Sequence, residues 1–357
     1  MFGLKRFLVF RMAQILTTTD FDEATEKAFA GAFQSAHLNF LIGSGASLPG
    51  IPAAGNIELE IAKLFDDDKQ EEALSKMCEF VASVQSPTNE LIECRDNPNN
   101  SECVDRYSDL LGIIESILVE RRTDLLPKQA NVFSTNYDLY VEKASERHSG
   151  IRLNDGFVRI PSLENRMVFS PQSFFDSTYN TGNLYNYKVE IPSVNLIKIH
   201  GSLSWTTNDD GEVSYLVETR DEPEAGSTVG QLKNYIRQFS VVLPQVEKFR
   251  ETIMNQIYYD LLRIYQNQLD RENTLLIVFG FSFADEHILK ITERALKNAT
   301  LKLILFAHDE ARAENYKEIF DAHRNVEIIS PTGTDKIEFP EFISILKTFV
   351  PIRWRRK

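Results

Sequence analysis

Cysteine is scarce in this chain of 357 residues. Its three cysteines, Cys78, Cys94 and Cys103, are too few for a four-thiolate zinc site, and no two of them form a Cys-x-x-Cys pair. We interpret them as buried or idle thiols in a reducing cytoplasm. No other set of residues with the spacing of metal ligands stands out, so we expect no metal.

Long apolar runs are also missing. A membrane-spanning helix needs about 18 or more consecutive apolar residues, and no such run occurs. The first residues, MFGLKRFLVFRMAQ, are too short and lack the small-residue cleavage site of a signal peptide. Met12 is an alternative start, which would make the residues before it an upstream extension. We therefore expect a cytoplasmic protein without a membrane partner.

Positive charge is in short supply as well. The formal net charge is −13, which argues against direct nucleic-acid binding over a broad surface, because such a footprint needs clustered Lys and Arg. The exception is the basic tail at residues 351–357, which we interpret as a solvated end or a contact with a partner chain. Internal repeats and low-complexity tracts are absent too.

What the chain does contain is apolar runs separated by helical patterns, with 43% hydrophobic residues overall. Strands that alternate with helices predict a mostly parallel sheet covered on both faces, a Rossmann-like α/β fold. The predicted strands are residues 38–42, 130–133, 196–199, 275–279, 301–306 and 326–329.

Three stretches between these strands are longer than a crossover requires. We predict an N-terminal extension at 1–30, and then one domain at 31–350 with insertions at 66–126, 150–192 and 206–270. The first insertion should be helical with a loop at 97–101, and the second irregular or short β-structure. The third should end in a helix from about Pro244 to Leu269. Insertions at the carboxyl end of a sheet often form lids, but scaffold or oligomer contacts are equally compatible.

The turn after the first strand reads Gly-Ser-Gly-Ala-Ser. Its glycines would let the backbone approach a pyrophosphate, and its amides favour negative charge. A tight turn without a ligand is the simpler alternative. The proposed nucleotide-binding residues here are Gly43, Ser44, Gly45, Ala46 and Ser47.

Asn136 and Asp138 follow the second strand. The Asn136 amide can position a ribose hydroxyl or a water, and the Asp138 carboxylate can accept hydrogen bonds from ribose. Asp138 is also a suitable N-cap for a helix at 139–145. We interpret Asn136 as a chemical residue and Asp138 as partly structural.

His200 ends the third strand and is followed by Gly-Ser, so its ring should emerge at the carboxyl end of the sheet. That position favours a general base or hydroxyl polariser. After the fourth strand, Gly280 and Ser282 could contact ribose or phosphate, while Asp285 could instead cap the next helix. His308 could line an adenine pocket. Ligands bind at the carboxyl ends of strands in open α/β sheets, so these turns should share one pocket.

In their order along the chain, these turns resemble the sirtuin family of NAD-consuming enzymes. Residues 43–47 resemble the family's GAGxS phosphate loop, and residues 50–52 match its GIP. Residues 134–138 stand where the family has TQNID. Residues 200–202 resemble its catalytic HG[ST], and residues 280–282 its later GTS.

Two departures from the deacylating sirtuins are clear. Residues 203–271 contain no cysteine, so the zinc ribbon is missing, and Ala53-Ala54-Gly55 replaces the Asp-Phe-Arg that follows GIP. Zinc-less chains of this pattern resemble the bacterial sirtuin-like NAD⁺ glycohydrolases of anti-phage defence. The resemblance implies that Asn136 and His200 form a catalytic pair that cleaves NAD⁺ to ADP-ribose and nicotinamide.

The same resemblance implies control of the activity, through a homo-oligomer or a HerA-type hexameric ATPase partner. Two other functions remain open: an NAD-dependent protein deacylase or ADP-ribosyltransferase, and a non-catalytic NAD or ADP-ribose sensing module. A plain dehydrogenase is disfavoured, because the GxGxxG helix entry and its acidic residue about 20 positions later are absent.

Overall fold

One parallel sheet organises the molecule. The computed structural model describes residues 13–18, 21–52, 57–121, 126–161, 166–182, 188–208, 212–221, 223, 227–241 and 252–350. The main sheet has eight strands in the order β1-β16-β15-β14-β2-β3-β9-β4, and every pairing in it is parallel. Its strands are β1 (Gln14–Thr17), β2 (His37–Ile42), β3 (Gln129–Ser134), β4 (Arg152–Asn154), β9 (Ser193–Lys198), β14 (Thr274–Phe279), β15 (Leu301–Phe306) and β16 (Val326–Ser330).

The predicted α/β fold is confirmed, and each of the six predicted runs is a strand of this sheet. β1 was not predicted. It pairs with β16 inside the stretch that we expected to be an extension, so the sheet begins before residue 31. The helix α1 (Glu23–Ser35) also belongs to the domain, because its Phe29 and Phe33 are buried in the core.

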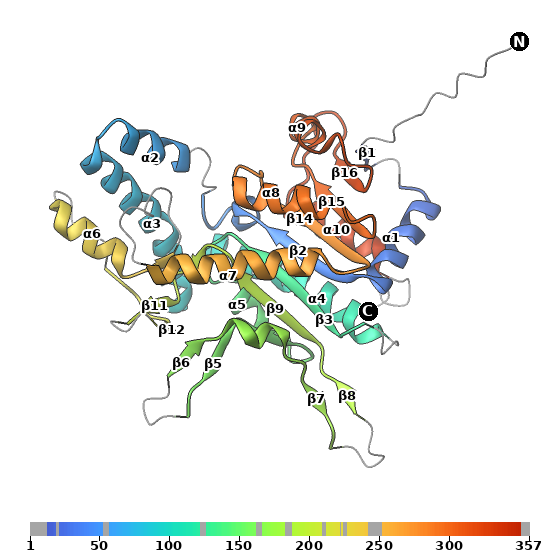
Figure 1. Ribbon diagram of the computed structural model, residues 1–357, viewed down its shortest axis with the longest axis horizontal. Coiled ribbons are helices and arrows are strands. Elements are labelled where there is room, and N and C mark those ends of the chain that lie inside the picture. Colours follow the sequence, from blue (N-terminus) through green and yellow to red (C-terminus); the bar gives the residue numbers. More distant parts are fainter. Residues whose placement is uncertain are drawn as a thin grey trace, which may run out of the picture.

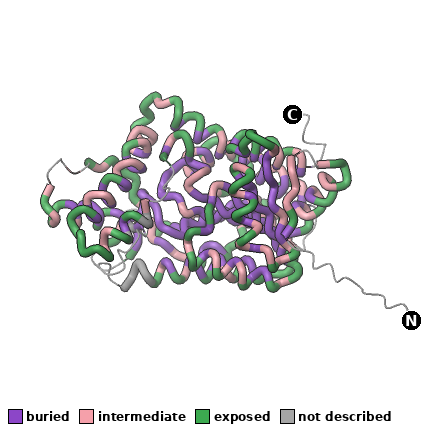
Figure 2. The backbone as a smooth tube through the Cα atoms, turned by 90° about the horizontal axis from the view of Figure 1, so that it is seen from above, coloured by how far each residue is buried: buried purple, intermediate pink, exposed green. Residues whose placement is uncertain are grey.

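Helices cover both faces of the sheet (Figure 1). On one face the core includes residues of α1, α4 (Pro98–Glu120), α5 (Tyr140–Ser145) and α10 (Phe339–Phe349). On the other it includes residues of α7 (Thr252–Leu269), α8 (Glu286–Ala295) and α9 (Glu310–Phe320). Seen from above, buried segments run through the middle of the molecule and exposed helical turns surround them (Figure 2).

The first insertion is helical, as predicted, and contains α3 (Gln70–Ile92) and α4; the helix α2 (Ile57–Asp66) leads into it. The loop predicted at 97–101 is wrong. Asn97 caps α4 by accepting hydrogen bonds from the amides of Asn99 and Asn100, and Pro98 occupies the first turn, where its missing amide costs nothing. The Asn- and Pro-rich sequence therefore starts a helix instead of interrupting one.

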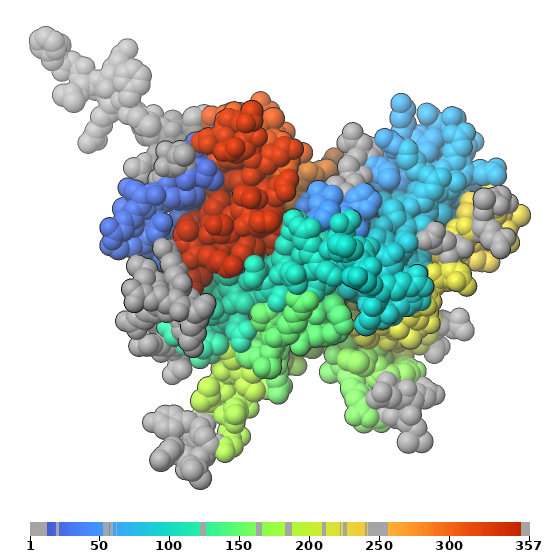
Figure 3. All heavy atoms as spheres, turned by 180° about the vertical axis from the view of Figure 1, so that it is seen from behind, coloured from blue at the N-terminus to red at the C-terminus, as the bar shows by residue number. Residues whose placement is uncertain are grey.

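The second insertion contains the short β-structure that we predicted. Its elements are β5 (Phe157–Arg159), β6 (Met167–Phe169), the 3-10 helix η2 (Pro171–Phe175), β7 (Tyr179–Asn180) and β8 (Val189–Glu190). The pairs β5–β6 and β7–β8 form two separate projections away from the sheet (Figures 1 and 3).

The third insertion contains short strands and helices. They are β11 (Trp205–Thr207), which begins one residue before the insertion, β12 (Val213–Tyr215), α6 (Val229–Arg237) and β13 (Ser240–Val241). The short strand β10 (Gly201–Ser202) precedes the insertion. The long helix that we predicted is α7, which the structure describes from Thr252; Pro244 lies outside the described residues, as does the basic tail. Within the described ranges, no helix has both the length and the apolar character needed to cross a bilayer.

A row of asparagines, here called the asparagine ladder, crosses four neighbouring strands; three of them are buried and Asn154 is half-buried. Asn39, Asn131 and Asn195 are register partners on β2, β3 and β9, and Asn154 of β4 pairs with Asn195. The amide of Asn131 donates to Asn39 (2.8 Å), that of Asn195 to Asn131 (2.9 Å) and that of Asn154 to Asn195 (3.0 Å). A slip by one residue would break all three bonds, so the ladder fixes how the strand ends align.

Candidate active site

Four neighbouring strands bring the candidate residues to one edge of the sheet. β14, β2, β3 and β9 lie side by side and run in the same direction. Gly43 follows β2, Asn136 comes two residues after β3, His200 two residues after β9, and Gly280 directly follows β14. All four therefore lie at the carboxyl edge of the sheet. In the sheet, β2 lies between β3 on one side and β14 on the other, so the strand order changes direction at β2. α/β proteins bind ligands at such switch points.

The two glycine turns pack against each other. Gly43 precedes the 3-10 helix η1 (Ser44–Ser47), and a Cβ atom on Gly43 would lie 2.4 Å from the carbonyl oxygen of Gly280. Gly280 has φ +67°, and a Cβ there would lie 2.6 Å from the Ala46 amide nitrogen. The Gly45 amide donates to the Gly280 carbonyl at 3.0 Å, and the Ala46 amide to Gly43 at 3.0 Å. These glycines thus let two backbone turns meet, and two amides of the first turn are already engaged within the protein.

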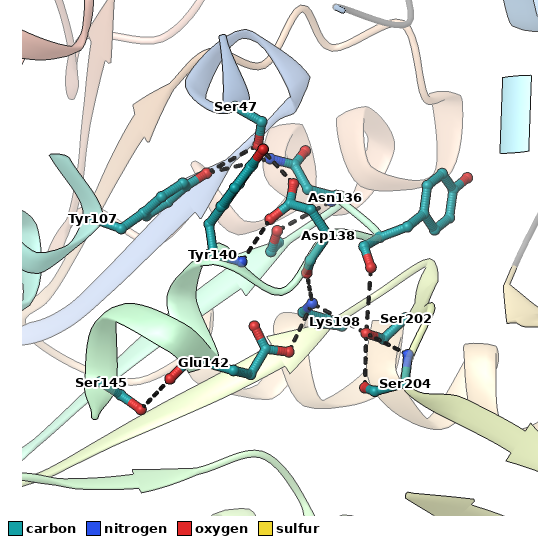
Figure 4. A network of polar contacts seen from close by, with 12 residues as sticks. Ser47, Tyr107, Asn136, Asp138, Tyr140, Glu142, Ser145, Lys198, Ser202 and Ser204 are labelled. Carbon is teal, nitrogen blue, oxygen red and sulfur yellow. Dashed lines mark hydrogen bonds and ion pairs between the residues drawn. The ribbon is translucent and has the colours of Figure 1, made fainter. Parts of the chain in front are cut away.

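Asn136 is buried beside the first turn, with 7% of its surface exposed. Its Nδ2 atom donates to the Gly43 carbonyl at 3.0 Å. The same atom donates to Ser47 Oγ at 2.9 Å (Figure 4). A carbonyl only accepts hydrogen bonds, so the atom that faces Gly43 must be the nitrogen. Asn136 Oδ1 is then left buried without a partner. Buried polar atoms are rarely unpaired, and this one is an acceptor available to a ligand.

Asp138 anchors the same turn. Its carboxylate accepts from Ser47 Oγ at 2.7 Å and from the Tyr140 amide at 3.2 Å, and the residue is 4% exposed. The helix α5 begins at Tyr140, one residue later than predicted, with Leu139 at the N-cap position. Asp138 still supports the helix start through Tyr140. Its structural role therefore stands on two hydrogen bonds, whereas a bond to ribose stays a prediction.

Tyr107 completes this cluster from α4, in the first insertion. Its hydroxyl lies 3.3 Å from Ser47 Oγ and 3.4 Å from Asn136 Nδ2. Burial, and next the charge of Asp138, raise the pKa of Tyr107 well above its usual value, so the phenol stays neutral. The sequence carried no signal for Tyr107, because it belongs to a helix that is distant along the chain.

His200 is held by a carboxylate from the loop that follows β14. Its Nε2 atom lies 3.0 Å from Asp285 Oδ2, although β2 and β3 separate the strands from which the two residues come. The other carboxylate oxygen caps α8, as predicted, by accepting from the amides of His287 (2.8 Å) and Ile288 (3.0 Å). The sequence did not predict the bond between Asp285 and His200.

The environment of Asp285 keeps it ionised. Burial raises the pKa of its carboxyl, but the hydrogen bond and charge of His200, together with the amides of Ile288 and His287, outweigh burial and lower it. An ionised Asp285 orients the His200 ring and would stabilise an imidazolium. His200 is itself 9% exposed, and its ring centroid lies 6.2 Å from that of Tyr258.

Ser282 and His308 lie outside this cluster. Ser282 is exposed, and its hydroxyl accepts from the Ala284 amide at 3.4 Å. The His308 side chain, 48% exposed, follows β15 and lies 3.2 Å from the carboxylate of its neighbour Asp309. Neither contacts Asn136 or His200 through a hydrogen bond, so their proposed contacts to a nucleotide stay predictions.

Metal chemistry has no evident ligands in the described part of the chain, where no group of three or more His, Cys, Asp or Glu side chains could hold an ion. The residues that replace the sirtuin Asp-Phe-Arg, Ala53 to Gly55, lie outside the described residues.

Residues 130–329 match the family model of a SIR2-like domain. The match covers 200 of the 357 residues. The matched part includes Asn136, His200 and Asp285, whereas the glycine turn after β2 precedes it. No curated protein matches the chain.

Proposed function

The chain belongs to the SIR2-like domain family, whose members are NAD-dependent enzymes, and we propose that it is an NAD⁺ glycohydrolase. The reaction would break the bond between nicotinamide N1 and ribose C1′. Nicotinamide leaves with the bonding electron pair, a water oxygen bonds to C1′, and the water loses a proton to give ADP-ribose. Because the leaving group is already cationic in NAD⁺, the site chiefly has to hold the ribose and stabilise a cation-like transition state.

The observation that supports this proposal best is the unpaired Oδ1 of Asn136. It is a fixed acceptor at the switch point of the sheet, and a ribose hydroxyl or the attacking water is the kind of donor that it lacks. His200 would accept the proton from that water or polarise a ribose hydroxyl, while Asp285 stabilises the charge that forms on the ring. The carboxylates of Asp138 and Asp285 add negative charge at this edge of the sheet, which favours a cationic transition state.

We propose that the diphosphate binds along the turn at residues 43–47. The Gly45 and Ala46 amides already bond to backbone carbonyls, so they would have to exchange partners before they could bind phosphate. Ser44 is half-buried at the start of η1 and offers the remaining polar side chain of the turn outside the Asn136 cluster. This refines the expectation that the whole turn acts as a phosphate cradle.

An unrestrained NAD⁺ glycohydrolase would exhaust the NAD⁺ of its own cytoplasm. We therefore propose that the protein acts in anti-phage defence and that oligomerisation or a HerA-type ATPase partner controls it. Full activity of an isolated monomer at cellular NAD⁺ concentrations contradicts this part of the proposal and leaves the reaction itself unaffected.

The test incubates purified protein with NAD⁺ and no peptide, and quantifies nicotinamide and ADP-ribose. We expect His200→Ala to remain folded and to turn over NAD⁺ at least ~10²-fold more slowly than wild type, the usual scale for losing a positioned acid–base group. His323→Ala, which removes a histidine beyond α9, is the matched control and should keep the wild-type rate.

Other results identify other functions. NAD⁺ loss at the wild-type rate in folded His200→Ala rejects the assignment of His200. Binding of NAD⁺ without turnover, also in the presence of the partner ATPase, indicates a sensing module. Release of O-acetyl-ADP-ribose from an acetylated peptide indicates a deacylase.

A further inference from the structure

A charged residue ends the buried strand β9. Lys198 interrupts the apolar sequence Leu-Ile-Lys-Ile, and its side chain is only 4% exposed. Its ammonium group has three partners: Glu142 Oε1 at 2.8 Å, Ser202 Oγ at 3.1 Å and the backbone carbonyl of Asp138 (Figure 4). An ammonium group carries three protons, so every donor of Lys198 is used.

The partners of Lys198 belong to the two segments that carry the proposed catalytic pair. Asp138 lies two residues after Asn136, and Ser202 lies two residues after His200. Next to the ammonium group, the Leu203 amide donates to the Tyr137 carbonyl at 3.0 Å, which joins the same two segments once more. The bonds of this one amino group therefore join the Asn136 segment to the His200 segment.

Stability alone does not explain a buried ion pair at this position. Removing two charges from water costs about as much as their attraction returns, and apolar residues of similar volume often serve equally well. Here the pairing is also incomplete, because Glu142 Oε2 is buried without a partner. Burial raises the pKa of Glu142, and the charge and hydrogen bond of Lys198 oppose it.

The charge of the pair matters for the proposed reaction. An unpaired buried ammonium group near the ribose would oppose a cation-like transition state. Glu142 lies in α5, the helix that starts directly after the Asn136 segment, and it cancels this charge while leaving the three hydrogen bonds of Lys198 in place. We call Lys198 and Glu142, with the bonds that they make, the clamp. Because Glu142 neutralises Lys198, the clamp adds no net positive charge beside the reacting bond.

We propose that Lys198 and Glu142 are positioning residues, which hold the Asn136 and His200 segments in register across the reacting bond without touching the substrate. This inference rests on the proposed NAD⁺ cleavage for its kinetic consequence, but the clamp itself is a statement about two segments of the protein.

The test compares wild type with Lys198→Met/Glu142→Leu, which replaces the pair by apolar side chains. We expect kcat for NAD⁺ cleavage to fall about 10²-fold, the effect of displacing catalytic groups by about 1 Å. KM should change by less than about threefold, because the groups that bind the substrate remain. The milder variant Glu142→Gln should also lower kcat, and it carries the test if the double variant does not fold.

The matched control is Lys302→Met/Glu327→Leu. This pair joins β15 and β16 at 2.9 Å and likewise leaves a buried carboxylate oxygen, Glu327 Oε2, without a partner. Its side chains are more exposed, 32% and 23% against 4% and 13% for Lys198 and Glu142. It lies away from the Asn136 and His200 segments, so its removal should change stability but leave kcat and KM as they are.

Hydrogen–deuterium exchange gives a second measurement that needs no turnover. Faster exchange confined to residues 134–140 and 199–205 in Lys198→Met/Glu142→Leu supports the clamp. Unchanged exchange there, or an unchanged kcat in a folded variant, overturns it. If wild type cleaves no NAD⁺ under any condition, the proposed function fails, and exchange alone decides whether the clamp exists.

Discussion

Two polar networks lie on opposite faces of the sheet, one across the middle of its strands and one at their carboxyl ends, and they differ in how completely their atoms are paired. The asparagine ladder points to the face covered by α7, while Lys198, three residues after Asn195, points to the face covered by α4 and α5. No side-chain atom of the ladder is buried without a partner, whereas the other network leaves Asn136 Oδ1 and Glu142 Oε2 unpaired.

The difference separates architecture from function. A fully paired network of neutral amides specifies the register of the strands and leaves no polar atom for a ligand to pair with. An incompletely paired network with charges is retained at a cost in stability, and such costs are typical of sites that bind or react. Substitutions in the ladder should therefore change mainly stability, and substitutions around Asn136 mainly chemistry.

The largest effect is expected for Asn136→Ala. Without the amide, the substrate acceptor is lost, and turnover of NAD⁺ should fall at least ~10²-fold, or at least about 2.7 kcal/mol in transition-state stabilisation. Stability should change much less than activity. Steady-state kinetics and thermal unfolding on the same preparation measure both, and a folded variant with wild-type turnover removes Asn136 from the mechanism.

The reverse pattern is expected for Asn131→Ala in the ladder. Removing its side chain leaves Asn39 Oδ1 without its donor and leaves Asn195 Nδ2 without one of its two acceptors. We expect a loss of about 2–3 kcal/mol in the free energy of unfolding, from buried polar groups left unpaired. Urea denaturation measures the loss, and kcat per folded molecule should stay near that of wild type. A larger effect on kcat than on stability contradicts the division of roles.

Asp285→Asn tests the contact between Asp285 and His200 with less disruption. Asparagine is as good an N-cap as aspartate, so α8 should keep its start, but His200 loses its ionised partner. We expect kcat to fall at least about tenfold, with a change in stability below about 1 kcal/mol. Asp22→Asn, at the exposed N-cap of α1, is the control and should leave kcat unchanged. An equal kcat in the two variants means that Asp285 only caps its helix.

The smallest effect concerns His37, at the amino end of β2, whose carbonyl accepts from Asn39 at 3.2 Å. Burial, and then the charges of Arg271 and Arg121, lower the pKa of His37 from 6.5 to about 4. Between these values the unfolded chain binds more protons than the folded one, so stability falls as pH drops from about 6.5 toward 4.

Because His37 is only half-buried, we expect its share of that loss to be about 1 kcal/mol at pH 5. His37→Gln should therefore lose less stability than wild type between pH 7.5 and 5, as measured by chemical denaturation. Equal losses in the two proteins mean that other groups determine the acid sensitivity.

The sequence predicted the fold well because its strands are apolar runs that end in Gly, Asn or His turns. It did not predict β1, because the four residues Gln-Ile-Leu-Thr are too few to show the hydrophobic pattern of a strand. Their pairing with β16 identifies them as one. It misinterpreted the Asn- and Pro-rich start of α4 because the same residue types begin helices and form loops.

For the site, the sequence identified the strand ends but not the bonds between them. Spacing along the chain does not predict that Asp285 contacts His200, because two strands lie between the strands that carry them. Nor does it predict that Tyr107 of α4 contacts Ser47. Lys198 did leave a signal, a single cation inside an apolar strand. Its partners became clear only when α5 was placed over the sheet.

The most direct measurement is a crystal structure of the His200→Ala variant with NAD⁺ bound, since the variant should retain the substrate without cleaving it. We predict a ribose hydroxyl or an ordered water next to C1′ within hydrogen-bond distance of Asn136 Oδ1, with the diphosphate along residues 43–47. NAD⁺ bound elsewhere, or bound here with Asn136 Oδ1 still unpaired, would contradict the assignment of this edge of the sheet as the catalytic site.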